Sequence, residues 1–125
     1  MHGVEIPRNE WSTALNQFSA AHQGWLVSLD LLDATNGLRE EIRNLPLLGI
    51  TAERTKPGTD ITIAAARSPS DHITHTISAP TQVRFDRTDD GVDEGLRIAS
   101  ANGTVAILRF HIAEWPENSD GTVRR

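Results

Sequence analysis

The chain has 125 residues, a formal net charge of −5 and no cysteine. A length of this order favours one domain, and the absence of cysteine excludes disulfides, thiol nucleophiles and cysteine-ligated metal centres. Because 17 acidic side chains outnumber 12 basic ones, nucleic acid is not the expected partner, since duplex binding relies on cations that neutralise phosphates.

The first eleven residues, MHGVEIPRNEW, lack both the basic region and the apolar region of a signal peptide. Along the sequence, no apolar run approaches the roughly 20 residues that are needed to cross a bilayer. We therefore expect a cytoplasmic protein that does not bind a membrane.

A helix is predicted to follow an N-terminal arm formed by residues 1–8. Asn9 is the expected N-cap, and Gly24 is suited to ending the helix. The large side chains that recur at helical spacing are Trp11, Leu15, Phe18 and His22. Such a stripe predicts an apolar face that covers a sheet.

After Gly24 the apolar period changes to the two-residue alternation of strands. The predicted strands lie within the runs WLVSLDLL, LLGITAER, DITIAAAR, HITHTI, TQVRFDR, LRIAS and VAILRF. Residues 38–45 stay ambiguous, because their apolar spacing suits a short helix whereas Pro46 disfavours helical geometry just before it. Asn102-Gly103, between the last two runs, predicts a type I′ hairpin.

The element order predicts an α+β fold. Short connections favour antiparallel neighbours, because parallel strands need long crossovers. We expect an N-terminal helix followed by a mostly antiparallel sheet of six or seven strands, which forms a small barrel or an open sandwich, with an Sm-like arrangement as one option. Residues 9–112 are the predicted single domain, and residues 113–125 are a polar C-terminal tail.

Four blocks of the sequence are similar to those of a known family. The blocks are HQGWLVSLDLL, RNLPLLGITAE, DHITHTISAPTQVRFD and GLRIASANGTVAILRF. From Trp11 to about Ile112, the chain resembles a family of small bacterial proteins described as domain of unknown function 5335. The resemblance implies a single bacterial domain, and it brings no activity, cofactor or catalytic residue with it.

The stretch DHITHTISAP holds the candidates for a chemical site. Asp71, His72 and His75, with His111 as a fourth, are residue types that ligate zinc or act as acids and bases. The β-branched run and Pro80 favour a strand here, and residues three apart on a strand point to opposite faces. Since His72 and His75 are then not expected to share an ion, we assign no catalytic, metal-binding or cofactor-binding residue.

The predicted function depends mainly on the unpaired edges of the predicted sheet. The sequence has no nucleophile elbow, P-loop or dinucleotide-binding glycine motif, so neither an enzyme nor a bound cofactor is the first expectation. Short strands leave at least one edge able to pair, which favours a non-catalytic module that binds a protein partner or forms a homo-oligomer. Two alternatives stay open: a small metal-dependent or hydrolytic site around Asp71, His72 and His75, and a small-ligand carrier.

Overall fold

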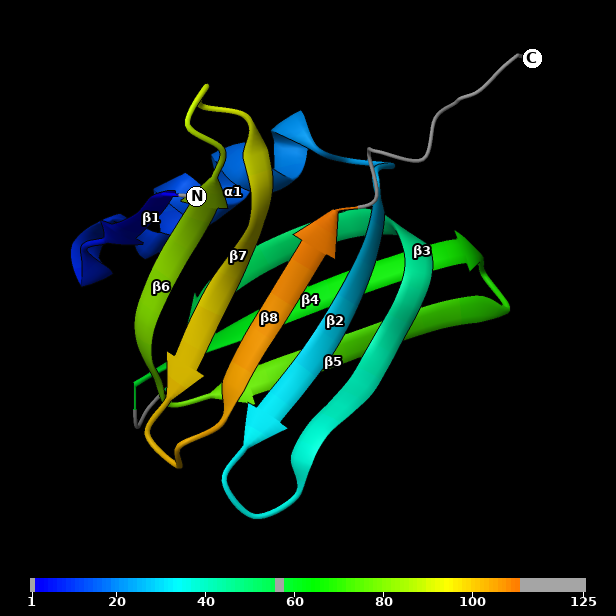
Figure 1. Ribbon diagram of the computed structural model, residues 1–125. Coiled ribbons are helices and arrows are strands. Elements are labelled where there is room, and N and C mark those ends of the chain that lie inside the picture. Colours follow the sequence, from blue (N-terminus) through cyan, green and yellow to red (C-terminus); the bar gives the residue numbers. More distant parts are fainter. Residues whose placement is uncertain (1, 56–57, 111–125) are drawn as a thin grey trace.

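Eight antiparallel strands and one helix make up the fold in a computed structural model, which describes residues 2–55 and 58–110 (Figure 1). The strands lie in the order β1-β6-β7-β8-β2-β3-β4-β5. In chain order, the elements are β1 (His2–Ile6), a 3-10 turn (Arg8–Glu10), α1 (Trp11–Ala21), β2 (Leu26–Asp33), β3 (Gly37–Arg54), β4 (Thr59–Ser68), β5 (Asp71–Ser78), β6 (Pro80–Arg87), β7 (Asp93–Ser100) and β8 (Val105–Phe110).

The prediction of an N-terminal helix followed by six or seven strands is wrong. A strand, β1, precedes the helix within the predicted arm, and it pairs with β6 from His2↔Arg87 to Ile6↔Val83. The ambiguous residues 38–45 belong to β3, a single strand of 18 residues. The sheet is open, with β1 and β5 at the ends of the strand order, and this open sheet replaces both the predicted barrel and the Sm-like option.

The bend of β3 divides the sheet into two layers. The first half of β3 pairs with β2 and its second half pairs with β4, so that β4 and β5 cross behind β8 and β2 (Figure 1). At the bend, Asn44 has a φ of 56°, a left-handed conformation that asparagine tolerates better than most residues. The Asn44 N–H donates to Ser28 Oγ at 3.0 Å, at the irregularity in the pairing of β2 with β3 between Val27 and Leu29.

The core fills the space between the two layers. The predicted core face of β2 is confirmed, because Val27, Leu29 and Leu31 are all buried. Burial does not alternate along the strand, since Ser28 and Asp30 on its other face are buried as well. Removing each such apolar side chain from water stabilises the fold by about 1.5–3 kcal/mol before the cost of ordering the chain is counted. The largest fully buried side chains from the other strands are Ile42, Leu47, Ile50, Ile61, Ile63, Val83, Leu96, Ile98 and Leu108.

Helix α1 packs against β3 and closes one side of the core. Its predicted apolar face is confirmed, since Trp11, Leu15 and Phe18 are buried. The Trp11 indole N–H donates to the carbonyl of Ile6 at 2.9 Å, and the ring of Phe18 stacks on Phe85 with centroids 4.5 Å apart. These contacts join the helix to β1 and β6.

The predicted start of the helix is wrong. Asn9 lies inside the 3-10 turn, and Glu10 occupies the N-cap position without a side-chain capping hydrogen bond. The turn is held from outside the helix, because the guanidinium of Arg8 lies 4.4 Å from the Trp11 ring and donates to the carbonyl of Pro80 at 3.3 Å. Tertiary contacts therefore fix the helix start in place of a local cap.

The predicted hairpin at Asn102-Gly103 is confirmed, but its turn type is not. The N–H of Ser100 donates to the carbonyl of Thr104 at 2.9 Å, and that of Gly103 donates to Ser100 at 3.0 Å. Gly103 has a φ of 92°, whereas Asn102 is not among the positive-φ residues. A type I′ turn needs positive φ at both central residues, so the three-residue loop with glycine in the left-handed position describes this hairpin instead.

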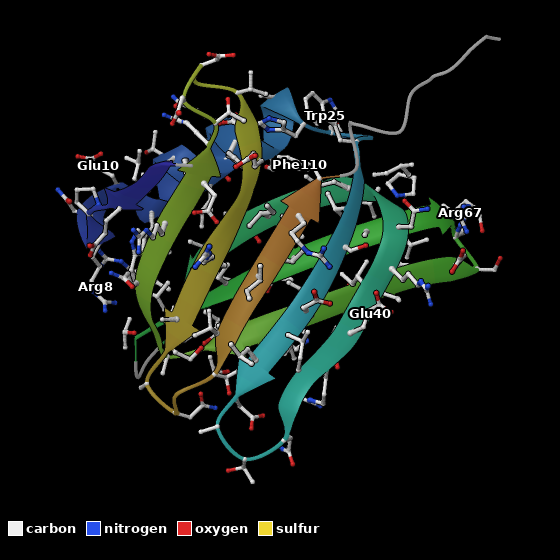
Figure 2. All side chains as sticks on the ribbon, in the orientation of Figure 1. Arg8, Glu10, Trp25, Glu40, Arg67 and Phe110 are labelled. Atoms are coloured by element: carbon white, nitrogen blue, oxygen red, sulfur yellow. The ribbon has the colours of Figure 1, made fainter. Side chains whose placement is uncertain are left out.

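His22 fastens the end of α1 to β7. Its ring is buried, and Nδ1–H donates to the carbonyl of Phe18 at 2.6 Å while Nε2 lies 3.1 Å from Asp93 Oδ2. The same ring stacks on Phe110 and meets the edge of Trp25, both at 4.6 Å between centroids. Figure 2 labels Trp25 and Phe110 close together at this end of the sheet.

We expect His22→Ala to lower the free energy of unfolding by about 2–4 kcal/mol, because it removes a buried ring and leaves the Phe18 carbonyl without its partner. Urea unfolding measures the change. The matched control is His72→Ala, an exposed histidine whose loss should change stability by less than about 0.5 kcal/mol. Equal effects of the two substitutions would contradict an anchoring role for His22.

Asp33 closes the β2–β3 hairpin and should make stability depend on pH. Its Oδ1 accepts the N–H groups of Asn36 at 2.6 Å and Thr35 at 2.8 Å, and the Asn36 bond above all holds the pKa of this carboxyl below its ordinary value of 3.8. A lowered folded-state pKa contributes stability above the ordinary pKa, and this contribution is lost as pH falls through the folded-state value.

We therefore expect Asp33→Ala to lower the melting temperature at neutral pH, and the difference from wild type to shrink as pH falls below the ordinary carboxyl pKa. Thermal unfolding across this pH range measures it. Asp33→Asn keeps an acceptor that does not titrate there, so its difference from Asp33→Ala should persist in acid. A wild-type advantage that does not change with pH would refute this reading of the hairpin.

Candidate functional site: the free edge of strand β5

Strand β5 ends the sheet and pairs with β4 alone among the described strands. Its register with β4 runs without a shift from Ala66↔His72 to Asp60↔Ser78, and the irregularity of this pair lies before that run, between Ala66 and Ser68. Seven consecutive residues of β5 therefore form a regular strand whose second side is not paired by any described strand. Such an edge presents a row of backbone N–H and C=O groups to other chains.

The two faces of β5 differ in chemistry. Ile73, His75 and Ile77 point toward the core, with Ile77 fully covered and the other two half-buried. Thr74 and Thr76 are exposed on the outer face together with His72 and Ser78. The alternation follows from the β-branched residues of HITHTI, which suit a half-buried pleated strand.

The candidate residues Asp71, His72 and His75 are not brought together. The carboxylate of Asp71 lies 3.2 Å from an Arg67 nitrogen, and Nε2 of His72 lies 3.5 Å from the Thr74 hydroxyl on the outer face. His75 lies on the inner face of the strand. The fourth candidate, His111, falls outside the described residues.

Within residues 2–55 and 58–110, no group of three histidine, cysteine, aspartate or glutamate side chains is placed to hold a metal ion. For Asp71, His72 and His75 the reason is visible in the strand, since a shared ion needs ligands on one face. The arrangement also lacks the linked nucleophile, base and acid of a hydrolytic triad, because the two imidazoles lie on opposite sides of the backbone.

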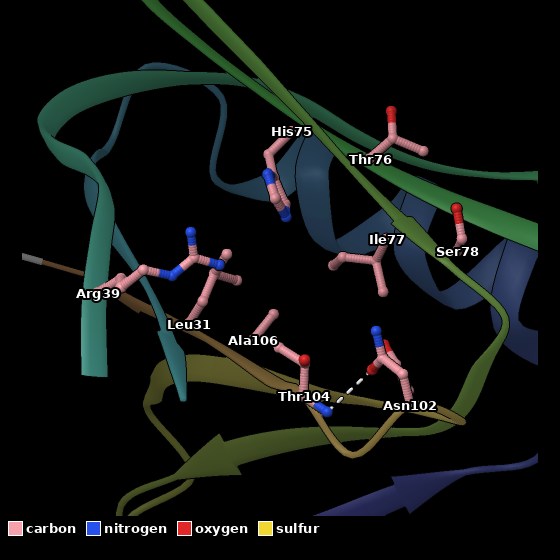
Figure 3. A pocket seen from close by; sticks show the side chains of 10 residues that line it. Leu31, Arg39, His75, Thr76, Ile77, Ser78, Asn102, Thr104 and Ala106 are labelled. Atoms are coloured by element: carbon pink, nitrogen blue, oxygen red, sulfur yellow. Dashed lines mark hydrogen bonds between the residues drawn. The ribbon is translucent and has the colours of Figure 1, made fainter. Parts of the chain in front are cut away.

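The inner face of β5 borders an open cavity of about 240 Å³. Figure 3 shows the ring of His75 and the side chain of Ile77 on one side of it, opposite Leu31, Ala106 and the turn that carries Asn102. The cavity thus lies where the two layers of the sheet separate, between β5 and the hairpin end of β7 and β8. Its lining mixes apolar and polar groups.

Two residues that sequence reasoning did not place at this site are Arg39 and Glu41. Nδ1 of His75 lies 3.8 Å from Glu41 Oε2, and Glu41 Oε1 lies 3.9 Å from an Arg39 nitrogen. Both separations exceed hydrogen-bonding distance, so neither contact is a hydrogen bond. No local signal indicates the contact, because it depends on how β3 and β5 are placed across the fold.

The other edges of the sheet are better protected than β5. β1 has only five residues, including the exposed Glu5. The first half of β3 carries four charged side chains within residues 37–45, and Arg67 reaches across to donate to the carbonyl of Asn44 at 3.0 Å. By contrast, residues 72–78 contain no lysine, arginine, carboxylate or proline, the features that usually prevent an edge from pairing.

Comparison with known proteins gives a family and no function. The model of a family described as "Family of unknown function (DUF5335)" matches residues 3–121, which confirms the resemblance seen in the sequence blocks. No curated protein matches, and no solved structure does. None of the described helical segments is long and apolar enough to cross a membrane.

Zinc is not expected to stabilise the protein, because His72 and His75 lie on opposite faces of β5. For protein purified without a histidine tag, the melting temperature should change by less than about 1 °C when zinc is added or when EDTA removes it, since a ligand of the native state would raise it. A zinc-dependent rise that both His72→Ala and His75→Ala abolish would instead establish a shared metal site.

Proposed function

We propose that this chain, which belongs to the DUF5335 family, is a non-catalytic module that binds an extended protein segment at the free edge of β5. The observation that supports the proposal is the regular run of residues 72–78, unpaired on one side by the described strands and free of charged gatekeeper residues. Edges of this kind accept an added strand through main-chain hydrogen bonds.

The two faces of β5 suggest what the added strand looks like. Its inward side chains would extend the row formed by Ile73, His75 and Ile77, and one of them could enter the cavity beside His75. Its outward side chains would lie next to Thr74 and Thr76. In strand addition the backbone supplies affinity and alternate side chains supply specificity, so the proposed ligand alternates apolar and small polar residues.

The two alternative functions have less support. The cavity beside His75, at about 240 Å³, is smaller than the roughly 300–1,000 Å³ typical of small-molecule sites. A larger cavity of about 720 Å³ is lined by Arg8, Trp11 and Thr55 and contains none of the residues named for a carrier or a chemical site. A hydrolytic site has no support in the geometry of Asp71, His72 and His75, which lie apart.

Selection from a peptide library tests this proposal. Peptides of about twelve residues that are selected against the immobilised protein should alternate apolar and polar residues, and they should slow amide hydrogen exchange in β5. Thr76→Lys should weaken their binding at least about tenfold, because lysine on an edge opposes strand addition.

Thr51→Lys is the matched control. Thr51 is also exposed on the outer face, but it lies on β3 and is separated from Thr76 by Thr62 of β4. Peptides should therefore bind this variant as they bind wild type. Selected peptides that bind both lysine variants and wild type equally, or that leave exchange in β5 unchanged, would refute strand addition at this edge.

A further inference from the structure

We infer that the segment bound by β5 is β5 of a second copy of this chain, paired antiparallel about a twofold axis that passes beside His75. The inference rests on the proposed function of the β5 edge and names its partner. It follows from three properties of the strand: a palindromic sequence, a match of faces, and the absence of opposing charge.

Residues 73–77 read ITHTI in both directions. Antiparallel pairing of a strand with its own copy places residues opposite one another at equal distances on either side of the axis. With the axis beside His75, Ile73 meets Ile77 of the second copy, Thr74 meets Thr76 of the second copy, and the two His75 rings face each other. Every position from 73 to 77 then lies opposite its own residue type.

This register also keeps each face continuous. Ile73 and Ile77 both point inward, while Thr74 and Thr76 both point outward, so that apolar side chains meet apolar ones and hydroxyls meet hydroxyls. A register shifted by one residue would bring outward threonines against inward isoleucines. Moving the axis to Thr74 would place Ile73 opposite His75 of the second copy, which is a poorer match.

The outer face already contains the pattern that the second copy would continue. Thr51, Thr62 and Thr76 lie side by side across β3, β4 and β5, and the hydroxyls of Thr62 and Thr76 are 3.3 Å apart. In the inferred dimer, Thr74 of the second copy takes the next place in this row. Cross-strand threonine pairs stabilise antiparallel sheets.

Charge does not oppose the pairing, although the chain has a formal net charge of −5. In this register Asp71 lies opposite Ala79 of the second copy, so no carboxylate of β5 faces another. The His75 rings at the axis each have the carboxylate of Glu41 at 3.8 Å. Between residues 72 and 78 the strand itself carries no carboxylate, so no charge of β5 opposes its pairing with a second copy.

Twofold pairing through β5 also ends the assembly at two copies. An isologous interface uses the same surface on both partners. The edge of β5 in each copy is therefore paired with the edge of β5 in the other, and neither can bind a third copy. The layer formed by the second half of β3, β4 and β5 becomes a six-stranded layer across the dimer. Of the other edges of the described strands, β1 is short and the first half of β3 is charged.

A charge exchange at positions 74 and 76 tests both the partner and the register. In the double variant Thr74→Lys with Thr76→Lys, lysines face each other twice across the axis, whereas Thr74→Lys with Thr76→Glu pairs lysine with glutamate twice. Both positions are exposed, so the two variants should fold alike, which circular dichroism and melting temperature verify. Thr51→Lys serves as the matched control on the same face.

By sedimentation equilibrium we expect wild type and Thr51→Lys to be dimers. The dimer dissociation constant of the lysine–lysine variant should be at least about tenfold higher than that of wild type. The dissociation constant of the lysine–glutamate variant should return to within about threefold of the wild-type value. A dimer that neither double variant affects would use another surface and would overturn the inference. Failure of the lysine–glutamate variant to recover would overturn the register on which the inference depends.

The same measurements separate this inference from the proposed function. A wild-type chain that stays monomeric from about 1 to 300 µM, yet binds selected peptides at β5, overturns the second copy as partner and leaves strand addition standing. A monomer that also binds no peptide at β5 overturns both. If the dimer is correct, peptides selected at low protein density should resemble ITHTI and should compete with dimerisation.

Discussion

Strand β3 belongs to both layers of the sheet, because its first half pairs with β2 and its second half pairs with β4. The two pairings meet between Pro46 and Leu47, and just before this point Asn44 has a left-handed conformation that few other residues adopt at comparable cost. From this corner, β4 and β5 fold back across β2 and β8 and enclose the core (Figure 1). The position of β5, and with it the cavity beside His75, depends on that bend.

An open sheet must manage its edges, and this one protects them unequally. β1 is short, and the first half of β3 is charged and contacted by Arg67. β5 has neither protection, although exposed regular edges promote uncontrolled association. Because β5 is palindromic, it could pair with β5 of a second copy. Such pairing would use the unpaired backbone groups of both strands and would leave no second edge of the same kind.

Much of the fold was predictable where local patterns decide structure. The apolar stripe of α1, the core face of β2 and the hairpin at Asn102-Gly103 follow from neighbours in sequence, and the structure has all three. The missed elements depend on distant partners. β1 is a strand because it pairs with β6, about 80 residues away, and residues 38–45 form a strand because β2 pairs with them, whatever their helical spacing.

The candidate site divides in the same way. The sequence by itself determined that β5 alternates, that His72 and His75 point to opposite faces, and that ITHTI is palindromic, because strand geometry has a period of two residues. Only the tertiary structure decided that this strand ends the sheet, and that Glu41 lies beside His75. Both facts depend on the bend of β3, which brings together residues more than thirty positions apart in the chain. The residues next to Glu41 and those next to His75 in the sequence do not indicate this contact.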